Sequence, residues 1–266
     1  MPESPEVSYL SSYISSFCKN KPLTSIQILK GRYLKHGPPE NFKAFTTQLP
    51  LKLTDVQKKG KVLFLYFEND LCIISKLGLT GWWYVNDDAP TWKPTTPNLK
   101  FTFPNNLNLY YTDTLSYGTL TITNNPQDIQ KQLNSLAEDI ETISLKTLLQ
   151  NIESKPRLQD KLIEDTIIEQ DGYVSGIGNY LKSEILYDAK ISPLRQTKDL
   201  SNDDWKQVLK SARKVIKKIT KAMNDEHAYM ETMNVYQRDY DKKGNKIHKH
   251  KTKSGRTTFW VPEIQV

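Results

Sequence analysis

The sequence is poor in the residues that hold metals or form disulfide frameworks. Its 266 residues include two cysteines, Cys18 and Cys72, and four histidines. Each cysteine lies in an apolar stretch, so we expect two buried free thiols and a compartment that keeps thiols reduced. A zinc site with four cysteine ligands is excluded, because the chain has too few thiols to build one.

Long apolar runs are absent as well. No run of about 18 apolar residues occurs, and the beginning of the chain has neither the basic start nor the apolar segment of a signal peptide. We therefore expect an intracellular protein without membrane contact. A hydrophobic content of 37% and a charged content of 25% are typical of a globular protein. The length suffices for two modest domains, each with its own core.

Acidic residues are outnumbered, which gives a net charge of +7 and a pI near 9.1. Such a balance favours an acidic partner such as nucleic acid. The segment KKGNKIHKHKTKSGR, residues 242–256, holds seven Lys or Arg and no Asp or Glu. By composition it is either a solvated basic tail or a hairpin. The apolar and β-branched TTFWVPEIQV that follows favours a hairpin anchored to a folded body.

The first half of the chain has the pattern of a β-sandwich or barrel. Short β-branched or aromatic runs alternate there with Gly, Pro, Asn and Asp. These runs are LTSIQILKG, KVLFLYF, LCIISKLG, WWYV, LKFTFP, LNLYYT and TLTIT. Before them, PEVSYLSSYISSFCKN predicts an amphipathic helix with Val7, Leu10, Ile14 and Phe17 on one face.

From about residue 124 the apolar residues recur with a helical period. The clearest helix is predicted over residues 201–224, with Ser201 as N-cap and Asp203 and Asp204 in its first turn. Its lysine-rich opposite face is most simply a solvated surface. The polar segment 125–142 contains Pro126 and is predicted to link two domains.

A Gly-x-Gly turn precedes a second helix in GYVSGIGNYLKSEILYDAKISP, residues 172–193. The helix is predicted to begin near Tyr180. Exposed backbone N–H groups and the Asn179 amide at a helix start would suit a phosphate. Most such turns only let the chain bend, so this motif alone leaves both interpretations open.

Five motifs together resemble one family. GIGNYLKSEILYDAKISP is similar to the helix-two-turn-helix element of the formamidopyrimidine-DNA glycosylase and endonuclease VIII (Fpg/Nei) family, and MPESPEV resembles its N-terminal Pro-Glu-x-Pro-Glu-Val. KKGKVLFL around Lys61, SKLGLTG around Leu79 and SGRTTFW around Arg256 also match, in the family's order. The resemblance covers nearly the whole chain.

The resemblance gives the opening MPESPEV a chemical meaning, where composition alone suggests a frayed terminus. Removal of Met1 would leave Pro2 with a free secondary amine. The resemblance implies that this nitrogen attacks C1′ of a damaged nucleotide, displaces the base and forms an iminium, after which elimination cuts the strand. Glu3 would be the general acid/base, which requires a pKa raised by a sheltered site. Glu6 matches a supporting acidic position, and Lys61 an essential lysine near the damaged nucleotide.

Other matched positions concern the DNA. The resemblance implies that Asn179 and Arg256 clamp backbone phosphates, and that Leu79 fills the space left by a flipped nucleotide, although strand packing would equally explain an apolar residue there. The family's Asp-Pro-Arg-Arg-Phe-Gly corresponds to DTLSYGT here, which keeps Asp113 and Gly118 but has Leu115 and Ser116 where arginines are expected. Tyr117 would still wedge or stack, whereas the arginines that would recognise the opposite base are replaced.

The C-terminus departs from the family's four-cysteine zinc finger and resembles its zincless members. Val261 and Ile264 occupy the last two metal positions. We expect Phe259, Trp260 and Val261 to anchor the hairpin in place of a metal. The histidines, His248 and His250, are too few for a structural zinc site and are expected to face phosphate or water.

Substrate choice is predicted from a short connection. Only NDEHAYMETMN, residues 224–234, separates the long helix from a hairpin strand expected to start near Val235. Members that act on 8-oxoguanine have a longer loop here. The short connection favours oxidised pyrimidines, ring-opened purines or hydantoins.

The predicted fold is α+β with four parts. Residues 1–124 form a catalytic β-sandwich domain with an N-terminal helix, 125–142 a linker, 143–233 a helix-two-turn-helix domain, and 234–266 a zincless finger hairpin. The predicted function is a DNA glycosylase with abasic-site lyase activity that needs no cofactor or metal. It would act as a monomer on double-stranded DNA carrying oxidised bases or abasic sites. Whether it also acts on single-stranded DNA is left open. The alternative is a DNA-binding protein of this fold that has lost catalysis.

Overall fold

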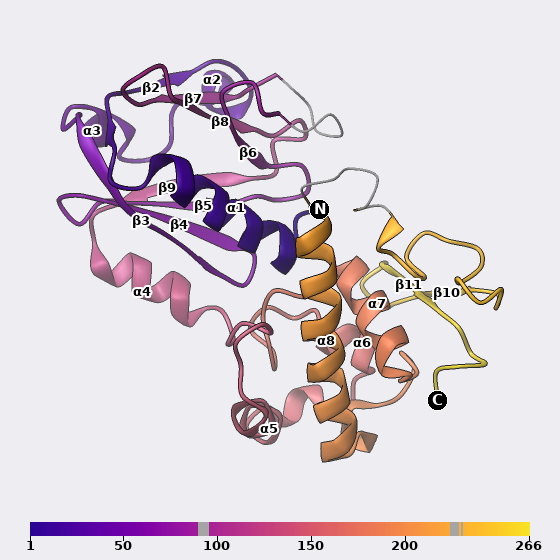
Figure 1. The fold of residues 1–266 in the computed structure, drawn as a ribbon. Helices are drawn as coiled ribbons and strands as arrows, with labels where there is room; N and C mark the ends of the chain where they lie inside the picture. Colours follow the sequence, from indigo (N-terminus) through magenta and orange to yellow (C-terminus); the bar gives the residue numbers. More distant parts are fainter. Residues whose placement is uncertain (90–95, 224–228, 230) are drawn as a thin grey trace. The chain divides into compact units, whose positions relative to one another are not determined.

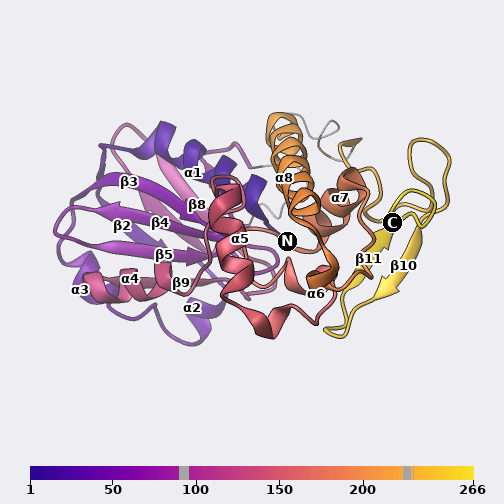
Figure 2. The ribbon, with the colours of Figure 1, turned by 90° about the horizontal axis from the view of Figure 1, so that it is seen from below.

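The computed structural model describes residues 1–89, 96–223, 229 and 231–266. These residues form two compact units, drawn in Figures 1 and 2. The first unit comprises Met1–Pro2 and Glu6–Asn134, and the second comprises Glu3–Pro5 and Ser135–Val266. A mixed α+β fold with an N-terminal sheet region and a helical C-terminal region was predicted, and it is confirmed.

The first unit is built on two antiparallel sheets (Figure 1). The five-stranded sheet has the order β1 (Pro22–Leu23), β3 (Leu51–Lys59), β4 (Val62–Phe67), β5 (Cys72–Lys76), β9 (Thr119–Thr123). The four-stranded sheet has the order β2 (Ser25–Ile28), β7 (Leu99–Thr102), β8 (Asn108–Thr112), β6 (Trp82–Val85). Buried side chains of both sheets share one apolar core, and Trp83 Nε1 donates across it to Ser75 Oγ at 3.1 Å. The predicted β-sandwich is therefore present.

Strand β3 was not among the predicted strands. Its buried residues Leu51, Leu53 and Val56 begin with a spacing of two, but the register against β4 shifts between Leu53 and Asp55. Such a bulge adds a residue to one strand and breaks the alternation of apolar side chains. The sequence pattern therefore looked irregular where the sheet is continuous.

Helices accompany these sheets: α1 (Ser4–Cys18), α2 (Arg32–Lys35), α3 (Phe42–Thr46) and α4 (Pro126–Asn134). The predicted core face of α1 is correct for Val7, Leu10 and Ile14, but Phe17 is 41% exposed. Cys18 is fully buried instead, because it follows Ile14 by four residues and so shares its face. Both Cys18 and Cys72 are buried free thiols, as predicted.

The second unit packs its helices around a separate apolar core. Its helices are α5 (Leu145–Glu153), η1 (Pro156–Leu158), α6 (Ile163–Thr166), α7 (Asn179–Ala189), η2 (Thr197–Asp199) and α8 (Asn202–Ala222). Ser201 caps α8 in a capping box with Asp204, which confirms the predicted helix start. Within the described ranges, no helix has the length and apolar character needed to cross a bilayer.

A two-stranded hairpin completes the second unit: β10 (His248–Lys251) pairs with β11 (Thr257–Trp260). The predicted hairpin is present in the basic segment. The expectation that its first strand starts near Val235 is wrong, because residues 235–247 form turns, bends and one isolated bridge between Tyr240 and Lys246, and β10 begins at His248. Of the short connection 224–234, residues 224–228 and 230 lie outside the described residues.

Candidate active site

The N-terminus of α7 holds the side chain of Glu3, which is 1% exposed. Glu3 Oε2 accepts hydrogen bonds from the backbone N–H groups of Gly178 at 2.7 Å and Leu181 at 3.2 Å, and Oε1 accepts from Tyr180 at 3.1 Å. The first N–H groups of a helix have no partner within the helix and form a positive end. They stabilise the buried carboxylate charge. The N–H groups that the sequence suggested for a phosphate are thus taken by a carboxylate of the same chain.

Gly176 lets the chain's first residues approach the turn before α7. Its φ is +98°, and a Cβ there would lie 3.0 Å from Ser4 Oγ. Ser4 N donates to Gly176 O at 2.9 Å, and Ser4 Oγ donates to Glu141 Oε1 at 2.5 Å. On the other side Gly176 N donates to Gln170 Oε1 at 2.9 Å. These bonds fix the position of Glu3 at the helix end.

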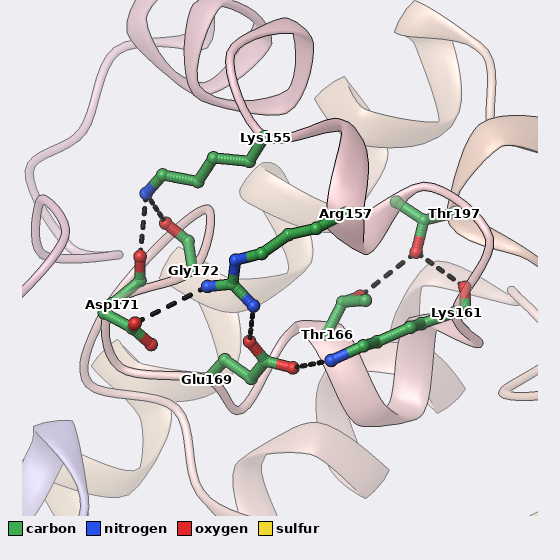
Figure 3. A network of polar contacts seen from close by, with 8 residues as sticks. All are labelled: Lys155, Arg157, Lys161, Thr166, Glu169, Asp171, Gly172 and Thr197. Carbon is green, nitrogen blue, oxygen red and sulfur yellow. Dashed lines mark hydrogen bonds and ion pairs between the residues drawn. The ribbon is translucent and has the colours of Figure 1, made fainter.

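A network of ion pairs holds the turn that leads into α7 (Figure 3). Glu169 pairs with Arg157 at 2.9 Å and with Lys161 at 2.7 Å. Lys155 Nζ donates to the carbonyl of Asp171 at 2.8 Å. Each contact is partly exposed, so solvent screens it and it adds little to stability by itself. Their shared effect is to restrain the turn before the Gly-x-Gly segment.

The start of α7 also holds the strand that follows Arg256. Asn179 Nδ2 donates to the carbonyl of Thr257 at 3.0 Å, and Phe259 N donates to Ser183 Oγ at 3.2 Å. Arg256 is exposed at the end of the loop between β10 and β11. The structure therefore brings together three of the predicted site residues, Glu3, Asn179 and Arg256, around the first turns of one helix.

The hairpin is anchored by an apolar cluster. Val235, Ile247, Phe259 and Val261 are buried in it, and Tyr187, Tyr236 and Ile264 pack against them. The positions that resemble metal ligands, Val261 and Ile264, offer no donor atom and contribute apolar contacts. These residues do not fit a metal, and packing takes its place.

One expectation for the hairpin is wrong and a second is incomplete. Trp260 is partly exposed and packs edge to face on His248, with ring centroids 6.4 Å apart, so it is not part of the anchor. His250 does not face phosphate or water alone, because its Nδ1 lies 2.6 Å from Oε1 of the fully buried Glu164. No local pattern in the sequence indicates this contact, because it joins residues far apart in the chain.

Glu184 is a further buried carboxylate that sequence reasoning missed. It is 1% exposed, and its oxygens accept from the backbone N–H groups of Asn234, Val235 and Tyr236 at 2.8 to 2.9 Å. It thereby fixes the segment that leads towards the hairpin. The sequence feature that could have indicated this role is a glutamate on the apolar side of a helix, because a glutamate is rarely buried without hydrogen-bond or ion-pair partners.

In the first unit, Pro2 and Glu6 are buried at the start of the chain. Lys61 lies in the two-residue turn between β3 and β4, after Gly60, whose φ is +56°. A positive φ at the first turn position and not at the second is the pattern of a type II′ hairpin turn. The turn holds Lys61 at the end of two paired strands.

Two loops of the first unit expose apolar side chains. Leu79, in the turn between β5 and β6, is 40% exposed, and Tyr117, in the loop between β8 and β9, is 63% exposed. Leu115 in the same loop is 50% exposed. Leu79 does not pack inside a strand, so that alternative for it is wrong.

These two loops lie against one another. A Cβ at Gly78 would come within 2.7 Å of Gly118 N, so the contact needs glycine there. The buried carboxylate of Asp113 accepts hydrogen bonds from Gly118 N at 2.7 Å and from the hydroxyl of Thr80. The side chains of Leu79 and Tyr117 are therefore presented by one connected structure.

Family models match most of the chain. The model described as the formamidopyrimidine-DNA glycosylase N-terminal domain matches residues 1–120, and the one described as its H2TH domain matches residues 134–229. The first covers the sheets up to the start of β9, and the second covers α5 to α8 with the turn that receives Glu3.

Curated relatives carry the same description along their length. Formamidopyrimidine-DNA glycosylase of Mycoplasmopsis pulmonis is 28% identical, over 100% of this chain and 98% of the relative. The protein of the same name from Arabidopsis thaliana is 25% identical, over 100% of this chain and 71% of the relative.

Solved structures share the fold. Lactococcus lactis formamidopyrimidine-DNA glycosylase, non-covalently bound to DNA containing an abasic site, matches with a TM-score of 0.81, 23% identity and 99% coverage of both chains. MutM in complex with DNA containing carbocyclic 8-oxoguanine matches with a TM-score of 0.82, 22% identity and 100% coverage of both. With both family models in chain order and Glu3 seated on the helix that carries Asn179, this chain belongs to the formamidopyrimidine-DNA glycosylase and endonuclease VIII family.

Proposed function

We propose that the protein removes damaged bases from DNA by forming an iminium on Pro2 and then cuts the strand by β/δ-elimination. Family membership makes it a DNA glycosylase of base excision repair with abasic-site lyase activity, acting on DNA that contains oxidised bases or abasic sites. The observation that carries the proposed mechanism is the position of Glu3 at the N-terminus of α7. Its hydrogen bonds connect the start of the chain to the helix that bears Asn179.

The first step uses Pro2 after removal of Met1. The secondary amine attacks C1′, the glycosidic bond breaks with its electron pair leaving on the base, and the base takes up a proton. The amine loses its proton, and the C1′–O4′ bond opens with its electron pair on O4′, which takes up a proton and leaves the iminium. Loss of a C2′ proton then expels the 3′-phosphate (β), and loss of a C4′ proton expels the 5′-phosphate (δ). Hydrolysis of the iminium by water releases Pro2.

Glu3 and Lys61 complete the proposed catalytic group. Glu3 exchanges protons with the sugar, and its charge in a sheltered site favours the cationic species that forms at C1′. The three N–H donors of α7 keep its carboxylate in one orientation. Lys61, fixed in its tight turn, supplies a cation close to the damaged nucleotide, and Glu6 supports the site from the buried face of α1.

DNA contact is proposed for two regions. Arg256 and Asn179 bind phosphates, with Arg256 exposed and positive at the hairpin loop. Leu79 and Tyr117 fill the space left by the flipped nucleotide, since both are apolar and exposed on linked loops. Leu115 at an arginine position offers no hydrogen bond to the opposite base.

The proposed substrates are oxidised pyrimidines, ring-opened purines and hydantoins. Support comes from the length of the 224–234 connection, which leaves little chain to enclose an oxidised purine. Excision of thymine glycol and of 8-oxoguanine from matched duplexes tests this choice. Comparable rates on both would refute it.

Borohydride trapping on abasic DNA tests the nucleophile. The mature chain is compared with Pro2→Ala and with Pro5→Ala, which is the same change three residues further on. We expect a covalent adduct from the mature chain and from Pro5→Ala, and at least about a hundredfold slower trapping from Pro2→Ala. Equal trapping by all three would assign the nucleophile to another residue.

The same experiment separates the enzyme from a non-catalytic DNA-binding protein. A chain that binds abasic DNA, has lost Met1 and forms no adduct would be the binder. The retained Pro2, Glu3 and Lys61 favour the enzyme, because binding alone needs none of this trio.

A further inference from the structure

The second unit contains a buried ionic cluster that the proposed chemistry does not use. Glu164 on α6 and Lys182 on α7 are both fully buried, and His250 on β10 contacts Glu164 at 2.6 Å. The His250 side chain keeps 37% of its surface exposed. Fully buried lysine and glutamate are rare because loss of water destabilises their charges. Their presence here calls for a function.

The charges around the cluster connect it to the site residues. Burial lowers the pKa of Lys182 to about 8, opposed first by the charge of Glu164 and then by that of Asp165. Arg256, of like charge, lowers this pKa further, and Glu3 raises it. Lys182 is therefore within electrostatic reach of both the carboxylate at the helix end and the arginine at the hairpin loop.

The cluster's hydrogen bonding is incomplete within the part of the chain that the structure describes. Lys182 Nζ, both Glu164 oxygens and His250 Nδ1 have no hydrogen-bond partner there, although His250 Nδ1 and Glu164 Oε1 lie 2.6 Å apart. Buried polar groups without hydrogen bonds are unfavourable for stability. Apolar residues of similar size would be better for stability alone, so the cluster is better explained by what it holds in place.

The hairpin has one contact to a helix on each strand, just below its loop. His250 on β10 reaches Glu164 of α6, and Thr257 on β11 accepts from Asn179 of α7. In the register, His250 lies opposite Thr258, and the next pair is Lys251 with Thr257. The loop that follows ends in Arg256. Two anchors on successive pairs fix both the position and the tilt of the loop.

We propose that Glu164 and Lys182 form a buried ionic seat for His250, which makes His250 a positioning residue for the phosphate contact of Arg256. Its Nδ1 lies against the Glu164 carboxylate at 2.6 Å, and the charge of Lys182 compensates that of the carboxylate. This inference rests on the proposed DNA contact of Arg256. It adds a device that orients the hairpin through a charge, in addition to the apolar cluster that anchors it.

The test is a double-mutant cycle on DNA affinity with a duplex that carries a tetrahydrofuran abasic analogue. His250→Ala is expected to weaken binding about tenfold, as a lost charge-assisted contact would. Arg256→Ala is expected to weaken it by a similar factor. The double variant should bind no more weakly than Arg256→Ala, because His250 acts only through that arginine.

Two further variants separate positioning from simple loss of structure. His250→Asn keeps a side-chain N–H donor at a similar distance and should bind within about threefold of wild type. His248→Ala, on the same strand and exposed, should behave like wild type. At saturating DNA, single-turnover trapping by His250→Ala should match wild type, since only affinity depends on Arg256.

Each outcome decides one question. Multiplicative losses in the double variant, or failure of His250→Asn to restore binding, would overturn the positioning role. If His250→Ala unfolds, the cycle is run with Glu164→Gln, which keeps an acceptor but removes the charge, and wild-type affinity there would equally refute the seat. If no variant loses affinity for DNA, including Arg256→Ala, the proposed phosphate contact itself is refuted.

Discussion

Replacement of Glu3 by glutamine should separate catalysis from folding. The carboxylate accepts three backbone N–H groups through two oxygens, two of them on Oε2. Glutamine keeps one oxygen, which can serve Gly178 and Leu181, while its NH₂ group faces the N–H of Tyr180. One buried donor without an acceptor costs about 1–3 kcal/mol. Since a folded protein of this kind is stable by about 5–15 kcal/mol, Glu3→Gln should fold.

The effect on catalysis should be larger and specific to base removal. Loss of general acid/base catalysis lowers a rate by about 10²- to 10⁴-fold. We therefore expect excision of an oxidised pyrimidine by Glu3→Gln to fall by this factor. Trapping on DNA that is already abasic should fall much less, because no base has to leave.

The assay is single-turnover excision on a thymine glycol duplex, beside borohydride trapping on abasic DNA and urea unfolding. Glu153→Gln is the matched control, since Glu153 is an exposed residue at the end of α5. Excision by Glu3→Gln at the wild-type rate would refute the role in proton transfer. Equal losses in excision and trapping would show instead that Glu3 only positions Pro2.

Three other predictions concern the remaining features of the structure. Val261→Ala, which removes two buried methyl groups from the hairpin anchor, should lower the unfolding free energy by about 2 kcal/mol in urea; an unchanged midpoint would show that the cluster is not tightly packed. Burial depresses the pKa of Lys182 to about 8, so above that pH the unfolded chain binds more protons than the folded chain. The unfolding free energy of the wild type should therefore rise with pH relative to that of Lys182→Met. The rise should reach up to about 1.4 kcal/mol per pH unit between about pH 8 and 10.5. Parallel pH profiles of unfolding would contradict this. Tyr117→Ala should weaken binding to lesion DNA by about 1–3 kcal/mol in a fluorescence titration, as expected for a lost stacking side chain. Leu115→Arg should raise the dependence of excision on the opposite base. Wild-type behaviour of both variants would exclude this loop from the DNA contact.

Most helices and strands could be predicted because the apolar residues of each recur with a single helical or strand period. Helix α8 shows its buried face, its cap and its acidic first turn in the sequence itself. Strand β3 was missed because a bulge interrupts its alternation after Leu53. Phe17 was placed in the core because a helical face is wide enough to include two neighbouring positions, and packing chose Cys18.

The candidate site was predictable only through motifs. Pro2, Glu3 and Asn179 were found because each lies in a segment with a recognisable order of residues. What the sequence did not reveal is that Glu3 occupies the helix end expected for a phosphate, since 175 positions separate it from Gly178. His250 and Glu184 were misjudged or missed for the same reason, because contacts between distant segments leave no local pattern.

The apolar hairpin anchor has a consequence for work under oxidative stress. A finger held by thiolates is lost when oxidants attack its sulfur atoms. Here aliphatic and aromatic side chains hold the hairpin, and neither cysteine belongs to it. Burial raises the pKa of both the Cys18 and the Cys72 thiol to about 12, so almost no reactive thiolate is present at neutral pH. The protein is thus equipped to retain the hairpin that we propose to contact DNA under the chemical conditions that oxidise bases.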